Sequence, residues 1–271
     1  MTQESGHAPR EETTPEGLRT LHDAEQLLIQ ACMERHGFRT WPTPYENPVA
    51  DDTEFPYAVT DPEWAGRHGY GSDIQRRVGE LMRSDPNRRY FGSLSPERRT
   101  AAVTALSGPR PVGLLAKLPG GSVVRRSSAG CVSEAERDLY GDLRTWYTVK
   151  KITDNLHGLR VKRVMADEEY ERSVKDWSAC MRKKGYPYAT PGEARASALE
   201  AVVGGEGRGD EIRTAVAEAR CAADSGLTGT ARRLDERYER SISRQYRKEI
   251  STRRALEAAA LPRATNALSE H

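Results

Sequence analysis

The sequence lacks several features that would place it in a large protein class at once. No apolar run approaches the roughly 18 residues that a membrane-spanning helix needs. Basic and acidic residues nearly balance, 42 against 40, so the chain has no large basic excess of the kind that dedicated nucleic-acid binders carry. It also contains no Walker loop, dinucleotide-binding fingerprint, HExxH or GxSxG motif. These absences leave the common nucleotide-binding and hydrolytic motifs without support.

The sequence also shows no secretory signal peptide in this numbering. Residues 1–13 are polar, with neither a basic segment nor an apolar core. Because this stretch has no apolar pattern, we expect it to be a disordered tail. The compartment stays open at this point: either the protein is cytosolic, or a leader has been removed from the numbered chain.

Cysteine is scarce, and its spacing excludes two common uses. Cys32, Cys131, Cys180 and Cys221 lie far apart, and no CxxC pair occurs. Zinc-ribbon and thioredoxin-like sites therefore lose their main signature. Four cysteines can pair in three ways, or they can remain as buried free thiols, and their spacing alone does not choose between these outcomes.

What the sequence does contain is a mainly α-helical pattern. Apolar residues recur at helical spacing, and dipeptides such as Thr14-Pro15 and Ser95-Pro96 mark helix starts. In these dipeptides the hydroxyl caps the first turn, and proline suits the first helical position. One β signal occurs over about 112–128, where two short apolar runs flank a Pro-Gly-Gly turn and predict a hairpin.

Two segments repeat one pattern, apolar-x-x-Cys-Met-x-x-x-Gly-aromatic. The first copy carries Cys32 and the second carries Cys180, and each is followed by an extended stretch bounded by proline. The cysteine lies one turn before the predicted helix end, where glycine permits a sharp turn. Since Cys131 follows the first copy and Cys221 the second, the pattern indicates a duplicated unit in which a Cys-Met helix is tied to a later helix.

Further short motifs accompany the repeat in a fixed order. They are Ala24-Glu25-Gln26 leading to Phe38, His68-Gly69-Tyr70-Gly71, Leu94-Ser95-Pro96-Glu97-Arg98, Leu118-Pro119-Gly120-Gly121, Gly130-Cys131 with Glu134-Ala135 and Leu139-Tyr140-Gly141-Asp142, and Ala219-Arg220-Cys221 with Gly226-Leu227. Together with the two Cys-Met segments they cover most of residues 20–260. In order and number they resemble a family of actinobacterial secreted proteins and lipoproteins of uncharacterised function. The resemblance implies export and a helical domain with disulfides, and it implies no established activity.

With the disulfides that this resemblance implies, we pair Cys32 with Cys131 and Cys180 with Cys221. The predicted fold is then mainly α, stapled by disulfides, with one small hairpin and with irregular segments rich in proline and aromatic residues. The expected organisation is a first Cys-Met unit with the hairpin over 14–160, a second with a long C-terminal helix over 161–260, and a tail over 261–271. We expect these parts to form one compact structure.

A candidate contact face combines residues of two irregular segments near the hairpin. Trp41 and Tyr45 belong to a Trp-Pro-Thr-Pro-Tyr stretch, and His68 and Tyr70 belong to a His-Gly-Tyr-Gly stretch. Aromatic residues beside prolines are suited to binding a peptide or a glycan, and we predict ligand binding at these four residues. The alternative is that the aromatic rings pack over the end of the first Cys-Met helix.

His68 is also the candidate for catalysis, as a general base held in a loop. The carboxylates nearest in sequence are Asp61, Glu63 and Asp73. No nucleophile is signalled, and a histidine that serves the turn is the alternative. We therefore assign no catalytic residue beyond this candidate, and the sequence favours a protein without enzymatic activity.

A soft-metal site is conceivable from Cys32, Met33 and His36 on one helix. The second copy has Lys184 in place of His36, and a protonated lysine is not a metal ligand. We therefore predict no metal and no cofactor.

The predicted last helix, over roughly 228–259, is locally basic. Between Arg232 and Arg254 it holds nine basic and four acidic residues. A solvated, salt-bridged face is the favoured interpretation, and nucleic-acid binding is the alternative.

These observations favour a non-catalytic, extracytoplasmic interaction or scaffolding protein of the actinobacterial cell surface, with a protein or cell-wall partner. Two alternatives stay open. One is a hydrolase that uses His68 with Asp61 or Asp73. The other is a cytosolic regulator that binds nucleic acid through the basic C-terminal helix.

Overall fold

The chain forms two compact units that are interleaved along the sequence. The computed structural model describes residues 13–46, 49, 53–204 and 207–270, so residues 1–12 of the expected tail lie outside it. Unit 1 comprises 1–46, 85–155 and 246–271, and unit 2 comprises 47–84 and 156–245. This division differs from the predicted one, since 47–84 belongs with the second Cys-Met segment and the C-terminal segment belongs with the first.

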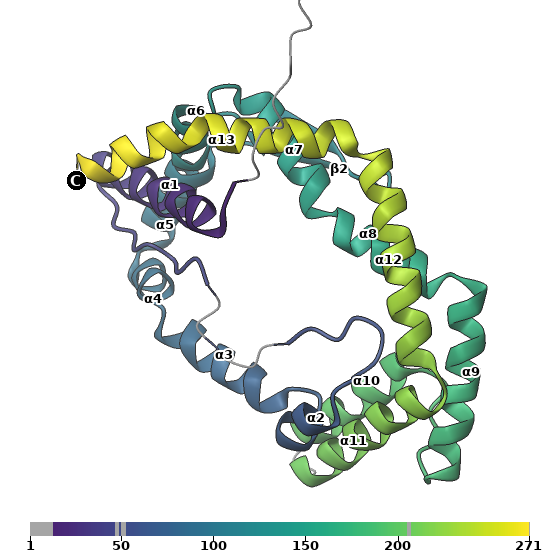
Figure 1. The fold of residues 1–271 in the computed structure, drawn as a ribbon. Helices are drawn as coiled ribbons and strands as arrows, with labels where there is room; N and C mark the ends of the chain where they lie inside the picture. Colours follow the sequence, from purple (N-terminus) through teal and green to yellow (C-terminus); the bar gives the residue numbers. More distant parts are fainter. Residues whose placement is uncertain (1–12, 47–48, 50–52, 205–206, 271) are drawn as a thin grey trace, which may run out of the picture. The chain divides into compact units, whose positions relative to one another are not determined.

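Unit 1 is a helical assembly with one antiparallel hairpin, in which α1 packs against α13 and α6 (Figure 1). Its apolar contacts include Leu21 and Trp146, with the Trp146 ring stacked on Tyr140 at 3.5 Å between ring centroids. The elements of unit 1 are α1 (Pro15–Arg35), α4 (Pro86–Ser93), α5 (Pro96–Ser107), β1 (Gly113–Lys117), β2 (Val123–Ser127), α6 (Cys131–Tyr140), α7 (Leu143–Asp154) and α13 (Arg247–Ser269).

The regular elements described in unit 2 are helices, and its core lies between α9, α11 and α12. Trp177 and Met181 of α9 are completely buried there against Leu227 and Leu234 of α12. The elements of unit 2 are α2 (Pro62–His68), α3 (Ser72–Ser84), α8 (Leu156–Met165), α9 (Glu168–Lys183), α10 (Pro191–Val203), α11 (Arg208–Asp224) and α12 (Leu227–Gln245). The predicted fold class, mainly α with one hairpin, is confirmed.

Five helices begin with the same device, a capping residue followed by proline at the first helical position. The cap side chain accepts a backbone N–H of the first turn, which would otherwise lack a partner. Proline loses nothing there because its missing N–H is one of those unpaired groups. The pairs are Thr14-Pro15, Asp61-Pro62, Asp85-Pro86, Ser95-Pro96 and Thr190-Pro191.

Both Cys-Met helices end in the same hydrogen-bonded turn. At the end of α1, Gly37 has φ of 75°, and the N–H of Phe38 bonds to the carbonyl of Met33 at 2.9 Å. At the end of α9, Gly185 has φ of 88°, and Tyr186 bonds to Met181 at 2.9 Å in the same way. Left-handed backbone at this position favours glycine, because a Cβ would strain it. The repeat seen in the sequence is therefore also a structural repeat.

Both predicted disulfides form. Cys32 near the end of α1 is bonded to Cys131 at the start of α6, and Cys180 near the end of α9 is bonded to Cys221 of α11. Each bridge lies within one unit, and the two loops that they close differ in length, with sequence separations of 99 and 41.

The predicted last helix is in fact two helices. The chain breaks at Tyr246, where φ is −106° and ψ is 22°, so that α12 ends at Gln245 and α13 begins at Arg247. Apolar residues at a strict four-residue step drift around a helix by about 40° per repeat, so one straight helix does not keep them on one face. The break lets α12 pack within unit 2 and α13 within unit 1.

The expected tail over 261–271 is also corrected, because α13 continues to Ser269. It passes through Pro262, which removes one helical hydrogen bond. The helix persists because Ala260 and Ala264 are completely buried in the cluster that α13 shares with α1. Arg263 adds a hydrogen bond of 2.6 Å from its Nε to the carbonyl oxygen of Leu139.

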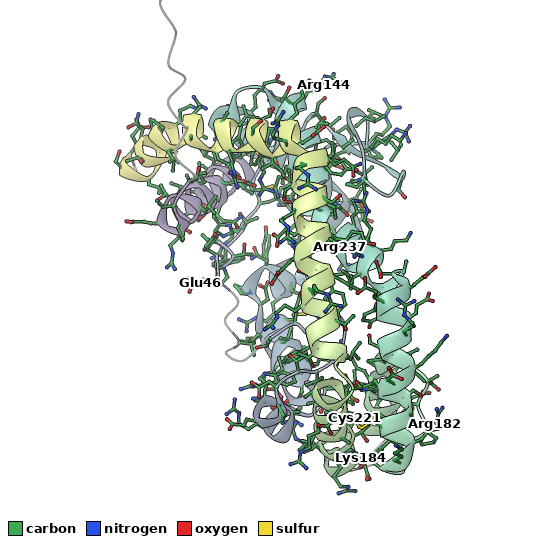
Figure 2. All side chains as sticks on the ribbon, turned by 45° about the vertical axis from the view of Figure 1, so that its right-hand side comes forward. Glu46, Arg144, Arg182, Lys184, Cys221 and Arg237 are labelled. Atoms are coloured by element: carbon green, nitrogen blue, oxygen red, sulfur yellow. A yellow bond between two sulfur atoms is a disulfide. The ribbon has the colours of Figure 1, made fainter. Side chains whose placement is uncertain are left out.

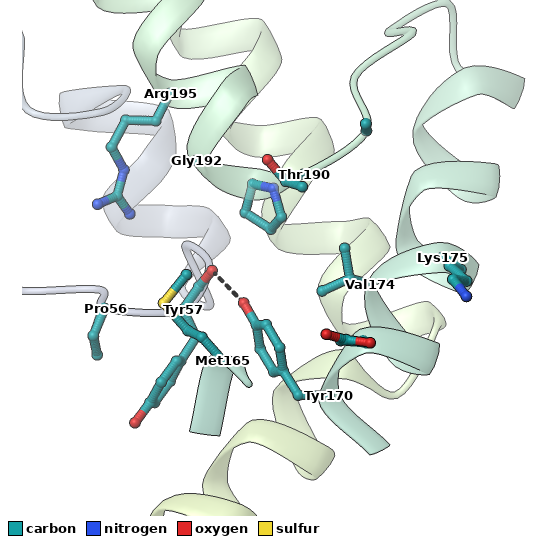
Figure 3. Close-up of a pocket in the computed structure, with 12 residues that line it drawn as sticks. Pro56, Tyr57, Met165, Tyr170, Val174, Lys175, Thr190, Gly192 and Arg195 are labelled. Atoms are coloured by element: carbon teal, nitrogen blue, oxygen red, sulfur yellow. Dashed lines mark hydrogen bonds between the residues drawn. The ribbon is translucent and has the colours of Figure 1, made fainter. Parts of the chain in front are cut away.

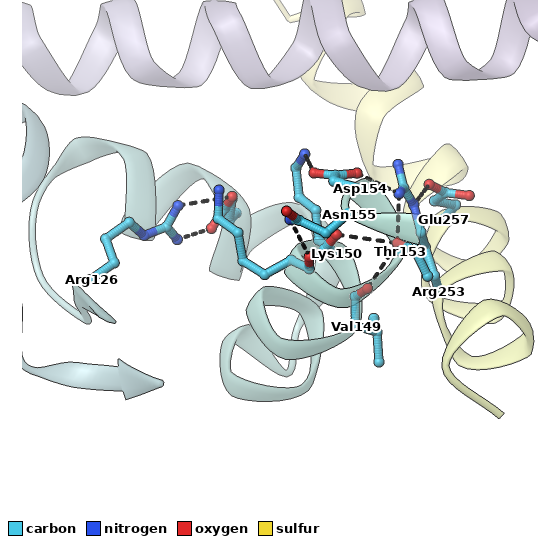
Figure 4. A network of polar contacts seen from close by, with 10 residues as sticks. Arg126, Val149, Lys150, Thr153, Asp154, Asn155, Arg253 and Glu257 are labelled. Carbon is cyan, nitrogen blue, oxygen red and sulfur yellow. Dashed lines mark hydrogen bonds and ion pairs between the residues drawn. The ribbon is translucent and has the colours of Figure 1, made fainter. Parts of the chain in front are cut away.

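A polar network joins α13 to the end of α7 in unit 1 (Figure 4). The Arg253 guanidinium donates to Thr153 Oγ1 and Asp154 Oδ1, both at 2.7 Å, and to Glu257 Oε1 at 2.8 Å. Lys150 Nζ lies 2.8 Å from the other oxygen of Asp154. Burial alone would raise the pKa of Asp154, and the contacts from Lys150 and Arg253 hold it below its ordinary value.

No helix among the described residues is long and apolar enough to cross a membrane.

Removing either disulfide should destabilise the unit that contains it. The chain-entropy relation gives about 5 kcal/mol for the Cys32–Cys131 loop and about 4 kcal/mol for the Cys180–Cys221 loop. We expect C32A/C131A and C180A/C221A to lower the urea midpoint of different transitions, followed by the fluorescence of Trp146 in unit 1 and of Trp177 in unit 2, each retained as the only tryptophan. If each variant lowered the urea midpoints of both fluorescence signals equally, the prediction that each disulfide stabilises only its own unit would be contradicted.

Candidate functional site

The predicted contact face combines residues of different units, and each half is described in its own unit. In unit 1, the backbone N–H and carbonyl of Trp41 bond to the side-chain amide of Asn87 at 2.8 and 2.9 Å. The Trp41 ring lies edge-on to Tyr90 of α4, with 5.8 Å between centroids. Tyr45 lies beside His22 of α1 at 5.5 Å and is 42% exposed. These contacts favour the packing interpretation for this pair.

In unit 2, His68 is buried at the end of α2 and pairs with a carboxylate. Its Nδ1 lies 2.9 Å from Asp73 Oδ2, and Arg208 lies 3.2 Å from the same oxygen. Burial alone would raise the pKa of Asp73, and the hydrogen bonds from His68 and Arg208 hold it below its ordinary value. Asp61 is used differently, because it caps α2 by accepting the N–H groups of Glu63 and Trp64. Asp73 is thus the candidate carboxylate that contacts His68 in the described structure.

Tyr70 is held by two buried glutamates of α11. Glu211 and Glu218 are seven residues apart, which places them on one face of the helix, and they are 1% and 0% exposed. Glu211 Oε1 accepts the backbone N–H groups of Tyr70 at 2.8 Å and Ser72 at 3.1 Å, and so pairs N–H groups at the start of α3. The approach is close: a Cβ on Gly69, whose φ is 61°, would lie 2.7 Å from the Glu211 carboxyl carbon.

Glu218 fixes the segment that precedes α2. Its Oε1 accepts the backbone N–H of Val59 at 2.7 Å, and its Oε2 accepts the phenol of Tyr70 at 2.6 Å. Burial raises the pKa of Glu218 to about 7, although both hydrogen bonds and the nearby charge of Arg195 oppose that rise. The same burial and the neighbouring Glu218 raise the pKa of the Tyr70 phenol.

Residues 53–60 form an irregular segment that several helices hold in place. Arg195 Nη2 of α10 donates to the carbonyl of Phe55 at 2.8 Å, and the phenol of Tyr170 of α9 donates to the carbonyl of Tyr57 at 3.3 Å. The Tyr57 phenol in turn donates to Asp235 of α12. Side chains from three helices thus satisfy the polar groups of a segment that has no helix or strand of its own.

A pocket of about 470 Å³ lies between this segment, α9 and the start of α10 (Figure 3). Figure 3 shows the rings of Tyr57 and Tyr170 beside Met165, with Val174 and Arg195 on other walls. Among the lining residues there is no serine, cysteine or histidine, and the Thr190 hydroxyl is engaged in capping α10. The lining residues are Pro56, Tyr57, Met165, Tyr170, Glu171, Val174, Lys175, Ala189, Thr190, Pro191, Gly192 and Arg195.

Arg195 borders a second pocket as well, of about 360 Å³, which also contains Trp64 and Tyr70. Its guanidinium lies 5.9 Å from the centre of the Tyr70 ring and forms no ion pair with a carboxylate among the described residues. Both pockets therefore share one half-buried cation. A third pocket of about 460 Å³, lined by Arg160 and Asp235 among others, borders the other side of the 53–60 segment.

Neither His68 nor Asp73 lines any of these three pockets. His68 is 7% exposed, and its Nε2 atom is buried. A general base has to come within hydrogen-bond reach of a substrate proton. The pair joins the end of α2 to the start of α3.

The cluster around the first disulfide does not offer thiolate ligands. Cys32 Sγ, Cys131 Sγ and a ring nitrogen of His36 lie within 4.8 Å of one another. Both sulfur atoms are bonded to each other, so neither is available as the deprotonated thiol that binds soft metals.

Several basic residues of the C-terminal region form ion pairs among the described residues. Arg233 and Arg237 of α12 form ion pairs with Glu169 and Asp167 at the start of α9. Arg253 of α13 is part of the network with Asp154 and Glu257. A salt-bridged face, the favoured interpretation of the sequence, describes these contacts.

The buried glutamates and Arg195 were missed by sequence reasoning, because charged residues on a helix normally face solvent. One signal was present. Glu211 and Glu218 stand seven apart in a helix whose buried positions are otherwise filled by small residues, including Ala215, Ala219 and Ala222. Alanine side chains on the same helix face are too small to cover a neighbouring carboxylate. A glutamate among alanines therefore indicates that another part of the chain packs closely against that face.

Comparison of the chain with family models, curated proteins and solved structures gives no match.

The raised pKa of Glu218 predicts a specific dependence of stability on pH. The folded protein keeps this proton until about pH 7, whereas the unfolded chain releases it near the ordinary glutamate pKa of 4.5, so the free energy of unfolding falls as pH rises between these values. The loss amounts to about 3 kcal/mol above pH 7. Since Gln can accept from Val59 and donate to Tyr70, we expect E218Q to match the wild type near pH 4.5 and to be increasingly more stable above it.

The measurement is urea unfolding from pH 4.5 to 8, read as variant minus wild type. Glu25 of unit 1 also has a pKa raised to about 7 by burial, and its contribution cancels in this difference. E80Q, at an exposed glutamate of α3, is the matched control and should give a flat difference. Parallel curves for E218Q and wild type would show that Glu218 is not a buried proton carrier.

Proposed function

We propose that this chain is a non-catalytic, extracytoplasmic interaction or scaffolding protein of the actinobacterial cell surface. The observation that carries the proposal is the closure of all four cysteines into two disulfides. Disulfides persist in oxidising compartments and are rare in the reducing cytosol. The absence of a membrane-spanning helix among the described residues is compatible with an extracellular protein.

The lining of the 470 Å³ pocket favours ligand binding over catalysis. The cysteines are consumed in disulfides, and the 470 Å³ pocket has no histidine or serine among its lining residues. A serine or thiolate nucleophile with a histidine base is therefore not provided by the residues that line this pocket. Aromatic and aliphatic walls with a few polar groups are typical of binding sites instead.

We assign this pocket as the contact site. It suits a ligand that presents an apolar group with an acidic group beside it. Tyr57, Tyr170 and Val174 provide apolar surface, and Arg195 provides a cation that no described carboxylate neutralises. A guanidinium recognises a carboxylate through paired N–H donors. The proposed partner is therefore a protein or cell-wall component that presents such a group.

A hydrolase is the second candidate, favoured by one observation, the 2.9 Å contact between His68 and Asp73. A histidine oriented by a carboxylate is the arrangement of a general base. The burial of Nε2 and the engagement of Nδ1 by Asp73 weigh against this candidate, because a substrate would have to displace one of these contacts to reach a ring nitrogen.

The decisive measurement is the thiol state of the protein in the cells that make it. Living cells are treated with N-ethylmaleimide before lysis, and the intact chain is analysed by mass spectrometry without reduction. We expect no alkylated cysteine, because all four are in disulfides in an oxidising compartment. The control is a sample denatured and reduced before alkylation, which should gain four labels.

Four labels without reduction would place the chain in a reducing compartment and overturn the proposal. Turnover of a p-nitrophenyl ester by the purified protein, lost in H68N and retained in H157N at the histidine of unit 2 that is 51% exposed, would overturn it in favour of the hydrolase.

A further inference from the structure

The β1–β2 hairpin presents two faces of opposite character. On the inner face, Leu114 and Ala116 are buried against Leu143 and Tyr147 of α7. On the outer face, Leu115 is 47% exposed. Alternate residues of a strand point to opposite sides, so the outer face is set by the same register that buries the inner one.

The outer face alternates apolar and basic residues across the two strands. Leu115 is paired with Arg125, and Lys117 is paired with Val123. Val123 is 45% exposed, and both Lys117 and Arg125 are exposed. Each apolar side chain thus has a cation directly opposite.

The positive charge of this region is not compensated locally. From Gly108 to Ser133 the chain holds no aspartate or glutamate, while it holds Arg110, Lys117, Arg125 and Arg126. Arg126 is used in the interior, where it pairs with Glu136 and lies over the Tyr147 ring. The other three form no ion pair with any carboxylate among the described residues.

This pattern differs from that of three arginines of α12 and α13. Arg233, Arg237 and Arg253 each have a carboxylate partner. On the hairpin, unpaired cations stand beside apolar side chains that remain exposed. A face that combines unpaired cations with exposed apolar side chains can bind a partner that is anionic and also offers an apolar phase.

We propose that the outer face of the hairpin binds the surface of an anionic lipid bilayer. Lys117 and Arg125 contact lipid phosphates, and Leu115 and Val123 enter the boundary between head groups and acyl chains. A soluble polyanion would use the cations and leave the apolar side chains in water, whereas a bilayer interface accepts both. The proposal stands independently of the pocket in unit 2, because the hairpin belongs to unit 1.

The test is co-sedimentation of the full chain with vesicles of phosphatidylglycerol mixed with phosphatidylcholine, compared with vesicles of phosphatidylcholine alone. We expect binding to the anionic vesicles that weakens as salt screens the charges. K117Q/R125Q should lower the partition coefficient about 30-fold, the factor that corresponds to about 1 kcal/mol for each cation near the surface. L115T/V123T should lower it at least tenfold at unchanged charge.

The matched control is K183Q/K184Q, which removes the same charge at the end of α9 in unit 2. Both lysines are exposed, and Figure 2 shows Lys184 beside Arg182 near Cys221, a second cationic surface of the protein. This variant should bind the anionic vesicles within about twofold of wild type. Circular dichroism and intact disulfides establish that each variant is folded, since the substituted side chains point away from the core.

Three results would overturn the proposal. One is the absence of binding to phosphatidylglycerol vesicles. Another is binding that L115T/V123T leaves unchanged while soluble heparin binds equally well, which would assign the face to a polyanion. The third is an equal loss in K183Q/K184Q and K117Q/R125Q, which would show that total charge, not the hairpin, controls attachment.

Discussion

Two buried carboxylates on α11 are the interaction on which the organisation of unit 2 depends. Glu211 and Glu218 accept backbone and side-chain hydrogen bonds from the stretch between Val59 and Ser72, which contains only the short helix α2. Without them, buried N–H groups would lose their partners, at a cost of about 1–3 kcal/mol each. The three pockets border the neighbouring 53–60 segment, yet none of their lining residues comes from α11. The site is therefore shaped by a helix that does not touch it.

The local features of the fold could be read from the sequence because they are decided by neighbouring residues. A capping residue before proline sets a helix start, and glycine after the Cys-Met segment sets a helix end. Both copies of that end close with the same hydrogen bonds, at Phe38 and at Tyr186. The hairpin over 113–127 follows from its Pro-Gly-Gly turn in the same way. The cysteine pairing needed more, since it rested on a resemblance to a family and not on spacing.

The features of the fold that could not be predicted from the sequence depend on contacts between residues that are far apart along the chain. Which segment covers Glu218 depends on contacts 159 and 148 residues away along the chain, to Val59 and Tyr70. The end of α12 at Gln245 depends on which unit each half of the pattern packs against. The contact face drawn through Trp41 and Tyr70 failed to anticipate that these residues belong to different units. Of its four residues, Tyr70 lines a pocket described above.

The connectivity of the two disulfides has a consequence for how the chain acquires them. Cysteines pair in the order in which they occur, the first with the second and the third with the fourth. A chain that emerges from a membrane pore amino end first exposes Cys32 and Cys131 before Cys180 has appeared. An oxidant that joins each cysteine to the previous free one therefore produces the native pairing directly. Unit 1 needs residues from both ends of the chain, but the covalent links of both units can be made in a single pass without an isomerase.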